Sequence, residues 1–106
     1  MKFKSDAYKR SRGGYSRLLD ITCASCSAHM FDYQKDGPGI LMRLYLDRIF
    51  RSSTYSDRQN QSLSSIPPLT CAKCNKLLGV PYIFQKENRL AYRLFAGAVA
   101  KRIIKS

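Results

Sequence analysis

Four cysteines are the residues of this chain best suited to chemistry, and they come as two Cys-x-x-Cys pairs. Cys23 and Cys26 form the first pair and Cys71 and Cys74 the second, with no cysteine left over. Two such turns that face each other can surround a Zn²⁺ ion with a tetrahedron of thiolates. The spacing therefore predicts one structural zinc ion held by all four sulfurs. Disulfides, redox-active thiols or another metal remain as alternatives.

Such an ion would join two distant parts of the chain, because 44 residues lie between Cys26 and Cys71. Four thiolates leave no open position for water or substrate, which indicates a structural rather than a catalytic site. His29, the only histidine, lies three residues after Cys26 and could replace a cysteine as ligand or act as a general base. Since four thiolates already complete the tetrahedron and no paired catalytic group accompanies it, we expect a strand histidine near the site.

The two halves of the chain resemble each other around the cysteines. Residues 21–26 match residues 69–74 position for position, except that Ser25 stands where the second half has Lys73. With small gaps, residues 33–36 also resemble 84–87, and 42–45 resemble 92–95. This predicts an internal duplication in which each half has one Cys-x-x-Cys knuckle followed by a β-hairpin. Asn75 suits a left-handed backbone at the knuckle exit, and Ser27 at the matching place suits it less.

The spacing of apolar residues favours strands. Apolar side chains alternate from Ile40 to Leu46 after the turn at 37–39, and two further strands are predicted at 80–84 and 90–94 around a turn at 86–89. Near the C-terminus, apolar residues recur every four positions, which favours a helix. We expect strand through about Phe95 and a short helix over 97–104. The predicted fold class is a small, mainly β domain of two knuckle-plus-hairpin halves around one zinc.

Length and charge set the broad organisation. The 106 residues suit one domain, which we divide into a basic N-terminal arm at 1–16 and a zinc-binding domain at 17–106 with a polar loop at about 51–68. The formal net charge is +12, and it falls to +10 when four thiolates hold one Zn²⁺. No stretch approaches the roughly 20 apolar residues that cross a membrane, and the N-terminus lacks the apolar core of a signal peptide. We therefore expect no membrane partner and a cytoplasmic protein.

A strongly basic chain favours an acidic partner such as RNA or single-stranded DNA. The N-terminal arm mixes cations with tyrosines, which suits phosphate contact and base stacking. The candidate residues are Lys9, Arg10, Arg12, Tyr15 and Arg17. The same composition is typical of a solvated, partly disordered terminus. Further tyrosines, at 8, 45, 55, 82 and 92, could stack on bases, although we expect 45, 82 and 92 to be core or sheet residues.

Paired Cys-x-x-Cys knuckles about 45 residues apart, each leading into hairpins, resemble those of zinc-ribbon proteins. More closely they resemble the β-tent group, which includes Yippee-type domains and the zinc-bearing methionine sulfoxide reductases of the B class. The resemblance covers roughly residues 17–100 and implies fold and zinc, not activity. The reductases need an additional catalytic cysteine, which this chain does not have. We therefore expect a non-enzymatic binding module. A protein-interaction adaptor is the main alternative, and a thiol redox protein is the third.

Overall fold

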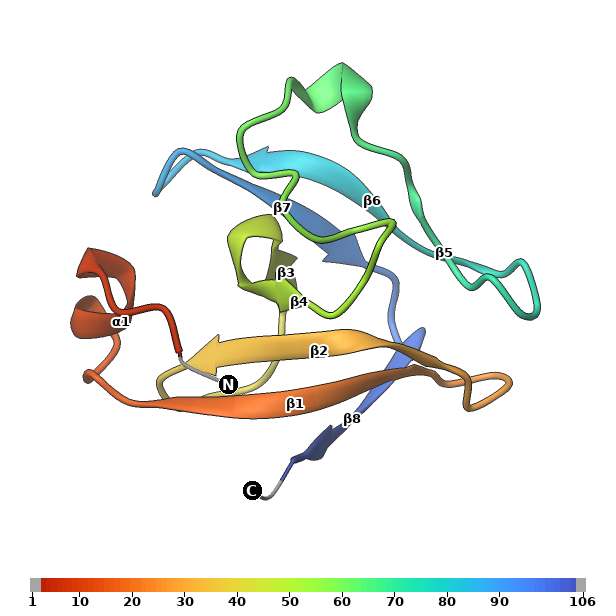
Figure 1. Cartoon of the computed structure of the whole chain (residues 1–106), viewed down its shortest axis with the longest axis horizontal. Helices are drawn as coiled ribbons and strands as arrows, with labels where there is room; N and C mark the ends of the chain where they lie inside the picture. The colour runs from red at the N-terminus through yellow and green to blue at the C-terminus, as the bar shows by residue number, and fades with distance from the viewer. Residues whose placement is uncertain (1–2, 105–106) are drawn as a thin grey trace.

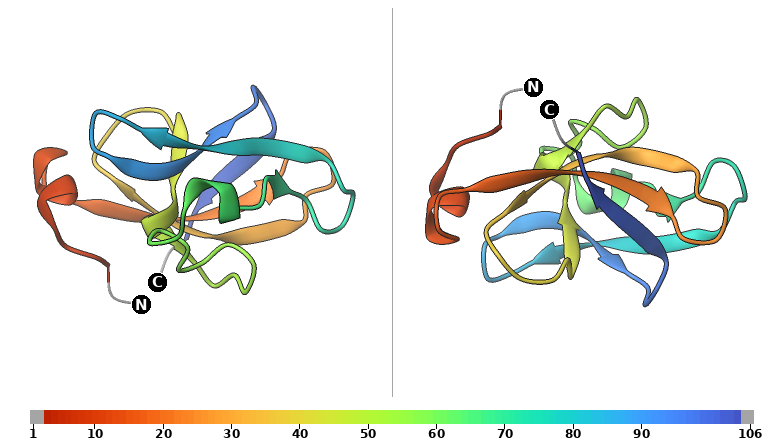
Figure 2. Two further views of the ribbon diagram at one scale, coloured as in Figure 1. Left: turned by 90° about the horizontal axis from the view of Figure 1, so that it is seen from above. Right: turned by 90° about the horizontal axis from the view of Figure 1, so that it is seen from below.

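The computed structural model describes residues 3–104, so residues 1–2 of the predicted arm and 105–106 of the predicted domain lie outside it. The fold is mainly β and consists of two four-stranded antiparallel sheets (Figure 1). Sheet A has the strand order β4-β2-β1-β8, and sheet B has the order β3-β7-β6-β5. The view from above in Figure 2 meets sheet B first, and the view from below meets sheet A first.

The elements are short, and the chain passes between the two sheets several times. Sheet A contains β1 (Ser16–Cys23), β2 (His29–Asp36), β4 (Ile49–Phe50) and β8 (Val99–Ile103). Sheet B contains β3 (Arg43–Tyr45), β5 (Leu69–Thr70), β6 (Leu77–Phe84) and β7 (Arg89–Leu94). The helical elements are α1 (Ala7–Ser11) and two 3₁₀ turns, η1 (Leu46–Arg48) and η2 (Leu63–Ser65).

The two halves of the chain exchange strands. β3 from the first half pairs with β7 in sheet B, and β8 from the second half pairs with β1 in sheet A. Apolar side chains on the facing sides of the two sheets form one core, since strand residues of one parity share a face. The core residues include Leu19, Ile21, Phe31, Tyr33, Leu44, Leu69, Leu78 and Tyr92.

Each knuckle is the turn of a hairpin, β1–β2 in sheet A and β5–β6 in sheet B. β2 and β6 are both eight residues long, and each begins three residues after the second cysteine of its pair. The halves therefore align without a gap at an offset of 48 residues, which agrees with the match of 21–26 to 69–74. This alignment puts Tyr33 opposite Pro81, so the predicted likeness of 33–36 to 84–87 is not a structural equivalence.

Two of the predicted elements are wrong. The strand expected from Ile40 to Leu46 is limited to β3, and Ile40 and Met42 are 78% and 62% exposed. The helix expected over 97–104 is the strand β8, which forms a ladder with β1 from Leu19↔Ile103 to Cys23↔Val99. In β8 the backbone N–H and C=O groups form hydrogen bonds with β1, whereas in a helix they would bond to each other. The strands expected at 80–84 and 90–94 are confirmed within β6 and β7.

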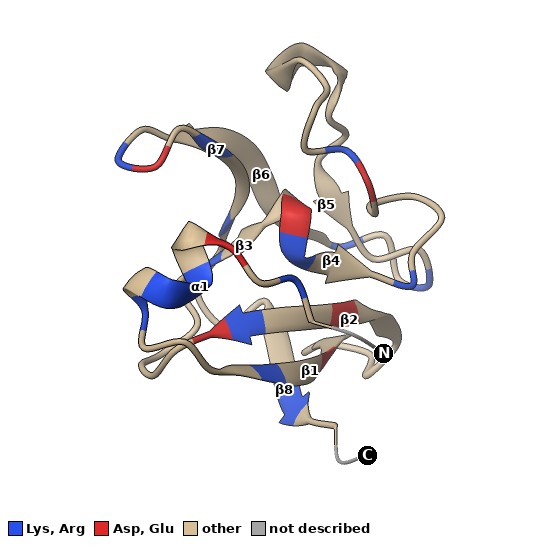
Figure 3. Cartoon of the chain, turned by 60° about the vertical axis from the view of Figure 1, so that its left-hand side comes forward, with Lys and Arg blue, Asp and Glu red and all other residues tan. Residues whose placement is uncertain are grey.

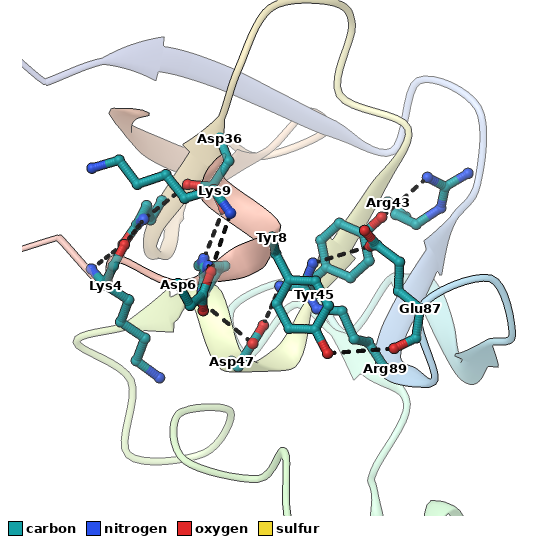
Figure 4. A network of polar contacts seen from close by, with 12 residues as sticks. Lys4, Asp6, Tyr8, Lys9, Asp36, Arg43, Tyr45, Asp47, Glu87 and Arg89 are labelled. Carbon is teal, nitrogen blue, oxygen red and sulfur yellow. Dashed lines mark hydrogen bonds and ion pairs between the residues drawn. The ribbon is translucent and has the colours of Figure 1, made fainter. Parts of the chain in front are cut away.

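A network of buried charges attaches the N-terminal segment to both sheets (Figure 4). Asp6 caps α1 by accepting from the Lys9 amide, and its carboxylate also pairs with Arg48 of η1 at 2.7 Å. Arg89 of β7 lies between the rings of Tyr8 and Tyr45, 3.9 and 3.8 Å from their centroids. The helix ends at Ser11, before Gly13 and Gly14, which both have positive φ. Residues 3–12 are therefore bound to the domain and do not form a solvated, disordered terminus.

The loop at 51–68 is also anchored. The Tyr55 side chain is buried, and its ring packs edge-on against Phe31 of sheet A and Tyr92 of sheet B. The Tyr55 hydroxyl accepts from the Thr70 amide and donates to the Thr70 carbonyl, both at 3.1 Å. Tyr55 and Tyr92 are thus core residues and unavailable for base stacking.

Candidate metal centre and basic surface

The four cysteine sulfurs gather at one end of the molecule, where the two knuckles meet (Figure 1, right). Cys23 Sγ lies 3.7 Å from Cys74 Sγ, and Cys26 Sγ lies 3.5 Å from Cys71 Sγ. All four sulfurs lie within 4.8 Å of one another. A tetrahedron with Zn–S bonds of about 2.3 Å has sulfurs about 3.8 Å apart. All four cysteines are free thiols, so the structure brings together the four predicted ligands at distances that suit one metal ion and holds them without disulfides.

The two knuckles have the same backbone geometry. In the first, Ser27 N–H donates to the Cys23 carbonyl at 2.8 Å; in the second, Asn75 N–H donates to the Cys71 carbonyl, also at 2.8 Å. Ser27 and Asn75 follow the second cysteines with φ of 65° and 62°. The left-handed conformation expected at Asn75 is confirmed, and Ser27 adopts it too. Because each sheet supplies one knuckle, a bound ion would connect the two sheets at this end.

Neighbouring groups shift the pKa values of the thiols in opposite directions. The Cys74 amide donates to the sulfur of Cys71 and is the main reason that its pKa falls to about 6. The Cys26 amide lowers the pKa of Cys23 in the same way. The Ala28 amide favours the Cys26 thiolate, but burial and the neighbouring thiols outweigh it and raise the pKa of Cys26 to about 11. Four adjacent thiolates repel one another, and a divalent cation offsets that repulsion.

Neither the lysine nor the histidine that follows a knuckle belongs to the group of four metal ligands. Lys76 Nζ donates to Ser25 Oγ at 2.9 Å, which links the two knuckles outside the sulfur group. His29, the first residue of β2, contacts Asp20 and is not one of the four clustered ligands. The expectation that His29 is a strand residue and not a fifth ligand of the cysteine group agrees with its place at the start of β2.

The predicted nucleic-acid residues differ in how available their side chains are to a ligand. Arg12 Nη2 pairs with Glu87 at 2.7 Å and donates to the Tyr45 hydroxyl at 3.1 Å, so this side chain is committed to the domain. Lys9 lies 5.4 Å from the Phe3 ring centroid. Arg10 is exposed, and so are Tyr15 and Arg17, whose guanidinium lies 5.9 Å from the Tyr15 ring centroid. Figure 3 shows further basic residues on β2 and β8, which extend the positive charge beyond the N-terminal segment.

A second basic surface, which was not predicted from the sequence, combines arginines with aromatic rings on sheet B. On the side of sheet B away from the core, Arg43 of β3 lies 4.1 Å from the Phe84 ring centroid and donates to the Tyr82 hydroxyl at 2.9 Å. Arg93 of β7 lies 4.9 Å from the Tyr82 ring centroid. Among the described residues, Arg43 and Arg93 have no acidic partner within ion-pair distance. The signal in the sequence is the alternation of Arg43 with Tyr45 and of Tyr82 with Phe84. We call Arg43, Tyr82, Phe84 and Arg93 the arginine–aromatic face.

A cavity of about 200 Å³ adjoins this face. Three cations line it, Arg12, Lys35 of β2 and Arg43 of β3. Lys35 Nζ donates only to the backbone carbonyls of Gly37 and Pro38 among the described residues. Burial, together with the nearby Arg17 and other cations, lowers the pKa of Lys35. Asp36 also lines the cavity, but its carboxylate pairs with Arg48, so the lining keeps an excess of positive charge between the two sheets.

Comparisons with known proteins add no relative: no family model matches the chain, and neither curated proteins nor solved structures give a match. In the part of the chain that the structure describes, no helix has the length and apolar character needed to cross a membrane.

Proposed function

We propose that the four cysteines hold one structural Zn²⁺ ion and that the protein uses its arginine–aromatic face to bind single-stranded nucleic acid. The sulfur-only ligand set favours zinc, and four thiolates leave no coordination position for a substrate. The ion would fix the knuckle ends of the two sheets, and its binding would be coupled to folding because its ligands come from both halves. We also propose that this two-sheet body is of the β-tent type, since each sheet contributes one knuckle.

The observation that carries the nucleic-acid proposal is the pair of unneutralised arginines, Arg43 and Arg93, set among aromatic rings on an open sheet face. Single-stranded nucleic acids bind where bases stack on aromatic rings and phosphates meet cations. Tyr82 and Phe84 are only partly buried, and Phe95 beyond the end of β7 is 44% exposed. These rings offer stacking surfaces beside the two guanidinium groups.

The cavity extends the same surface towards sheet A. A phosphate placed there would meet Lys35, Arg12 and Arg43 together. Arg12 is already paired with Glu87, so Lys35 and Arg43 supply most of the free positive charge. A strand of nucleic acid could then run from this cavity across Arg43 and Tyr82 to Arg93. The protein binds in this proposal and catalyses no reaction.

The test is fluorescence anisotropy with labelled single-stranded RNA and DNA oligonucleotides on zinc-loaded protein, over a series of salt concentrations. We expect affinity that falls steeply with salt, as counterion release requires. Tyr82→Ala removes a stacking platform and should weaken binding about tenfold or more. Arg93→Ala should weaken binding and reduce the salt slope by about one.

The matched control is Arg102→Ala. Arg102 is an exposed arginine on β8, at the outer face of sheet A, and its removal changes the net charge by the same amount as Arg93→Ala. If both variants weaken binding equally, the interaction depends on net charge and the arginine–aromatic face is not the site. Absence of binding at low salt would rule out the nucleic-acid function altogether.

A protein partner is the second candidate, and one observation favours it. Ile40 and Met42 are apolar residues in the loop before β3, and they are largely exposed beside the cavity. A contiguous exposed apolar patch, unlike a single exposed apolar residue, often marks a protein-binding surface. A partner that co-purifies after nuclease treatment, and that Met42→Lys displaces, would favour the adaptor function. Rapid alkylation of all four thiols in the metal-loaded protein would instead favour a redox protein.

A further inference from the structure

A second group of metal-ligand side chains lies on the outer face of sheet A. Asp20 of β1 and Asp32 of β2 occupy directly opposed positions, and His29 of β2 lies beside them. The three side chains can offer one ligand atom each, all within 4.8 Å of one another. His29 Nδ1 lies 2.5 Å from Asp20 Oδ1, and His29 Nε2 lies 3.8 Å from Asp32 Oδ1. The group shares no residue with the four cysteines.

A β-bulge brings His29 to this face. Ile21 pairs with Phe31, but the next residue of β1, Thr22, pairs with His29, so Met30 is the extra residue. In a regular strand His29 would share the core-facing side with Phe31, because side chains alternate. The extra residue reverses this parity and turns His29 towards the side of Asp20 and Asp32. Bulges commonly redirect a side chain in this way beside a functional site.

The second half of the chain provides an internal comparison. Its hairpin has the same bulge, since Leu69 pairs with Gly79 and Thr70 with Leu77. At the offset of 48 residues, the positions of Asp20, His29 and Asp32 are filled by Pro68, Leu77 and Val80. The bulge therefore belongs to the repeated hairpin, whereas the two carboxylates and the imidazole belong to the first half alone. The fold does not require ligand-type residues at these positions.

Asp32 is the independent indication that a cation belongs here. Its side chain is 3% exposed, and no described residue donates a hydrogen bond to its carboxylate; Oδ2 is fully buried. A buried carboxylate without hydrogen bonds is unfavourable, and so are two carboxylates at directly opposed positions. Arg51 Nη1 lies 3.3 Å from Asp32 Oδ2, and Arg102 Nη2 lies 3.1 Å from Asp20 Oδ2. Both arginines are about four-fifths exposed, so these ion pairs contribute little.

We propose that Asp20, His29 and Asp32 bind a divalent transition-metal cation. Each aspartate supplies a carboxylate oxygen and His29 supplies one ring nitrogen, a ligand set that suits Mn²⁺ or Zn²⁺ and differs from the sulfur-only set of the knuckles. The cation neutralises both opposed carboxylates and gives the buried Asp32 oxygens a partner. Arg51 and Arg102 can move into solvent when the cation binds. Three protein ligands leave further coordination positions open to water.

Mn²⁺ is the probe for this site, because it prefers oxygen and nitrogen ligands and does not compete for the thiolates. Protein carrying one equivalent of zinc, washed briefly with a chelator so that only the knuckle zinc remains, is titrated with Mn²⁺ by calorimetry and by NMR. His29 is the only histidine, so the imidazole signals report on one residue. We expect one saturable equivalent of Mn²⁺ and selective broadening of the His29 signals at substoichiometric Mn²⁺.

His29→Leu copies the residue that the second half carries at this position, and Asp32→Asn removes one carboxylate charge. Each variant should weaken Mn²⁺ binding at least about tenfold and keep its knuckle zinc. Asp57→Asn, which removes an exposed acid in the loop at 51–68, is the matched control and should bind Mn²⁺ unchanged. The proposal is overturned if Mn²⁺ fails to saturate or leaves the His29 signals sharp. It is also overturned if His29→Leu and Asp32→Asn bind Mn²⁺ as tightly as the control.

Discussion

Arg48→Met tests whether the buried charge network holds the N-terminal segment and the two sheets together. Arg48 is 1% exposed and contacts three carboxylates. Its Nη2 lies 2.7 Å from Asp6, its Nε 3.0 Å from Asp36 and its Nη1 3.4 Å from Asp47. Methionine keeps most of the apolar volume but removes the guanidinium, so the main effect is electrostatic.

The expected loss of unfolding free energy is about 3 kcal/mol. Hydrogen bonds to charged groups contribute about 1.5 to 3 kcal/mol each, and breaking a buried ion pair costs about 3 to 5 kcal/mol. Asp6 is more than one-third exposed, so its pair with Arg48 is discounted for solvent screening. Asp36 is 5% exposed and keeps hydrogen bonds from Ser16 and Gln34, which places the estimate at the lower end of the range.

The assay is equilibrium unfolding in urea, followed by circular dichroism in the presence of zinc. Arg102→Met is the matched control, because Arg102 is 81% exposed and its pair with Asp20 should contribute less than about 1 kcal/mol. Adding Asp36→Asn to Arg48→Met should recover more than about 1 kcal/mol, since it removes the unpaired buried charge. A loss below about 1 kcal/mol, equal to that of the control, would refute the reasoning.

Three further changes have outcomes that the structure sets. Ser27→Gly should raise the unfolding free energy by about 0.5 to 1 kcal/mol in urea unfolding, because Ser27 has φ of 65°; a loss would contradict this. Tyr55→Phe should lower the unfolding free energy by about 1 to 2 kcal/mol in the same assay, because the Thr70 amide loses its acceptor. An unchanged unfolding midpoint would contradict this. Arg12 lowers the pKa of Glu87. The pair therefore stabilises the folded state at neutral pH, and this contribution is lost as the pH falls through the lowered pKa of Glu87. Glu87→Gln should therefore reduce the stability difference between pH 7 and pH 3, and an undiminished difference would show that the pair is not coupled to folding.

Local patterns predicted the features that depend on neighbouring residues. The cysteine pairs meet because each Cys-x-x-Cys turn is a self-contained hairpin turn, and the repeat of 21–26 at 69–74 marks both hairpins. The strands within β6 and β7 followed from alternation and an intervening turn. Asn75 was expected at positive φ, and Ser27 shows that the knuckle backbone imposes this conformation on a less suited residue.

Long-range pairing decided the features that the sequence did not reveal. Residues 99–103 have helical spacing, but the open edge of β1 makes them a strand. Ile40 and Met42 alternate like strand residues, yet no neighbouring strand pairs with them and both side chains are exposed. The buried Arg48 draws its carboxylates from three separate segments, so no local pattern marks it.

The candidate sites also differ in whether a local sequence pattern reveals them. The cysteine ligands carry a local signature, whereas the arginine–aromatic face requires β3, β6 and β7 to be placed side by side. The group of Asp20, His29 and Asp32 depends on a bulge that reverses the parity of His29. Regular alternation would have placed His29 on the opposite side of the strand from Asp32.

Zinc-edge X-ray absorption on natively purified protein, washed briefly with a chelator to clear weakly bound metal, tests the central claim most directly. We predict one zinc per chain with a shell of four sulfurs at about 2.3 Å. Two disulfides in place of metal, or a zinc shell dominated by oxygen and nitrogen, would contradict the account.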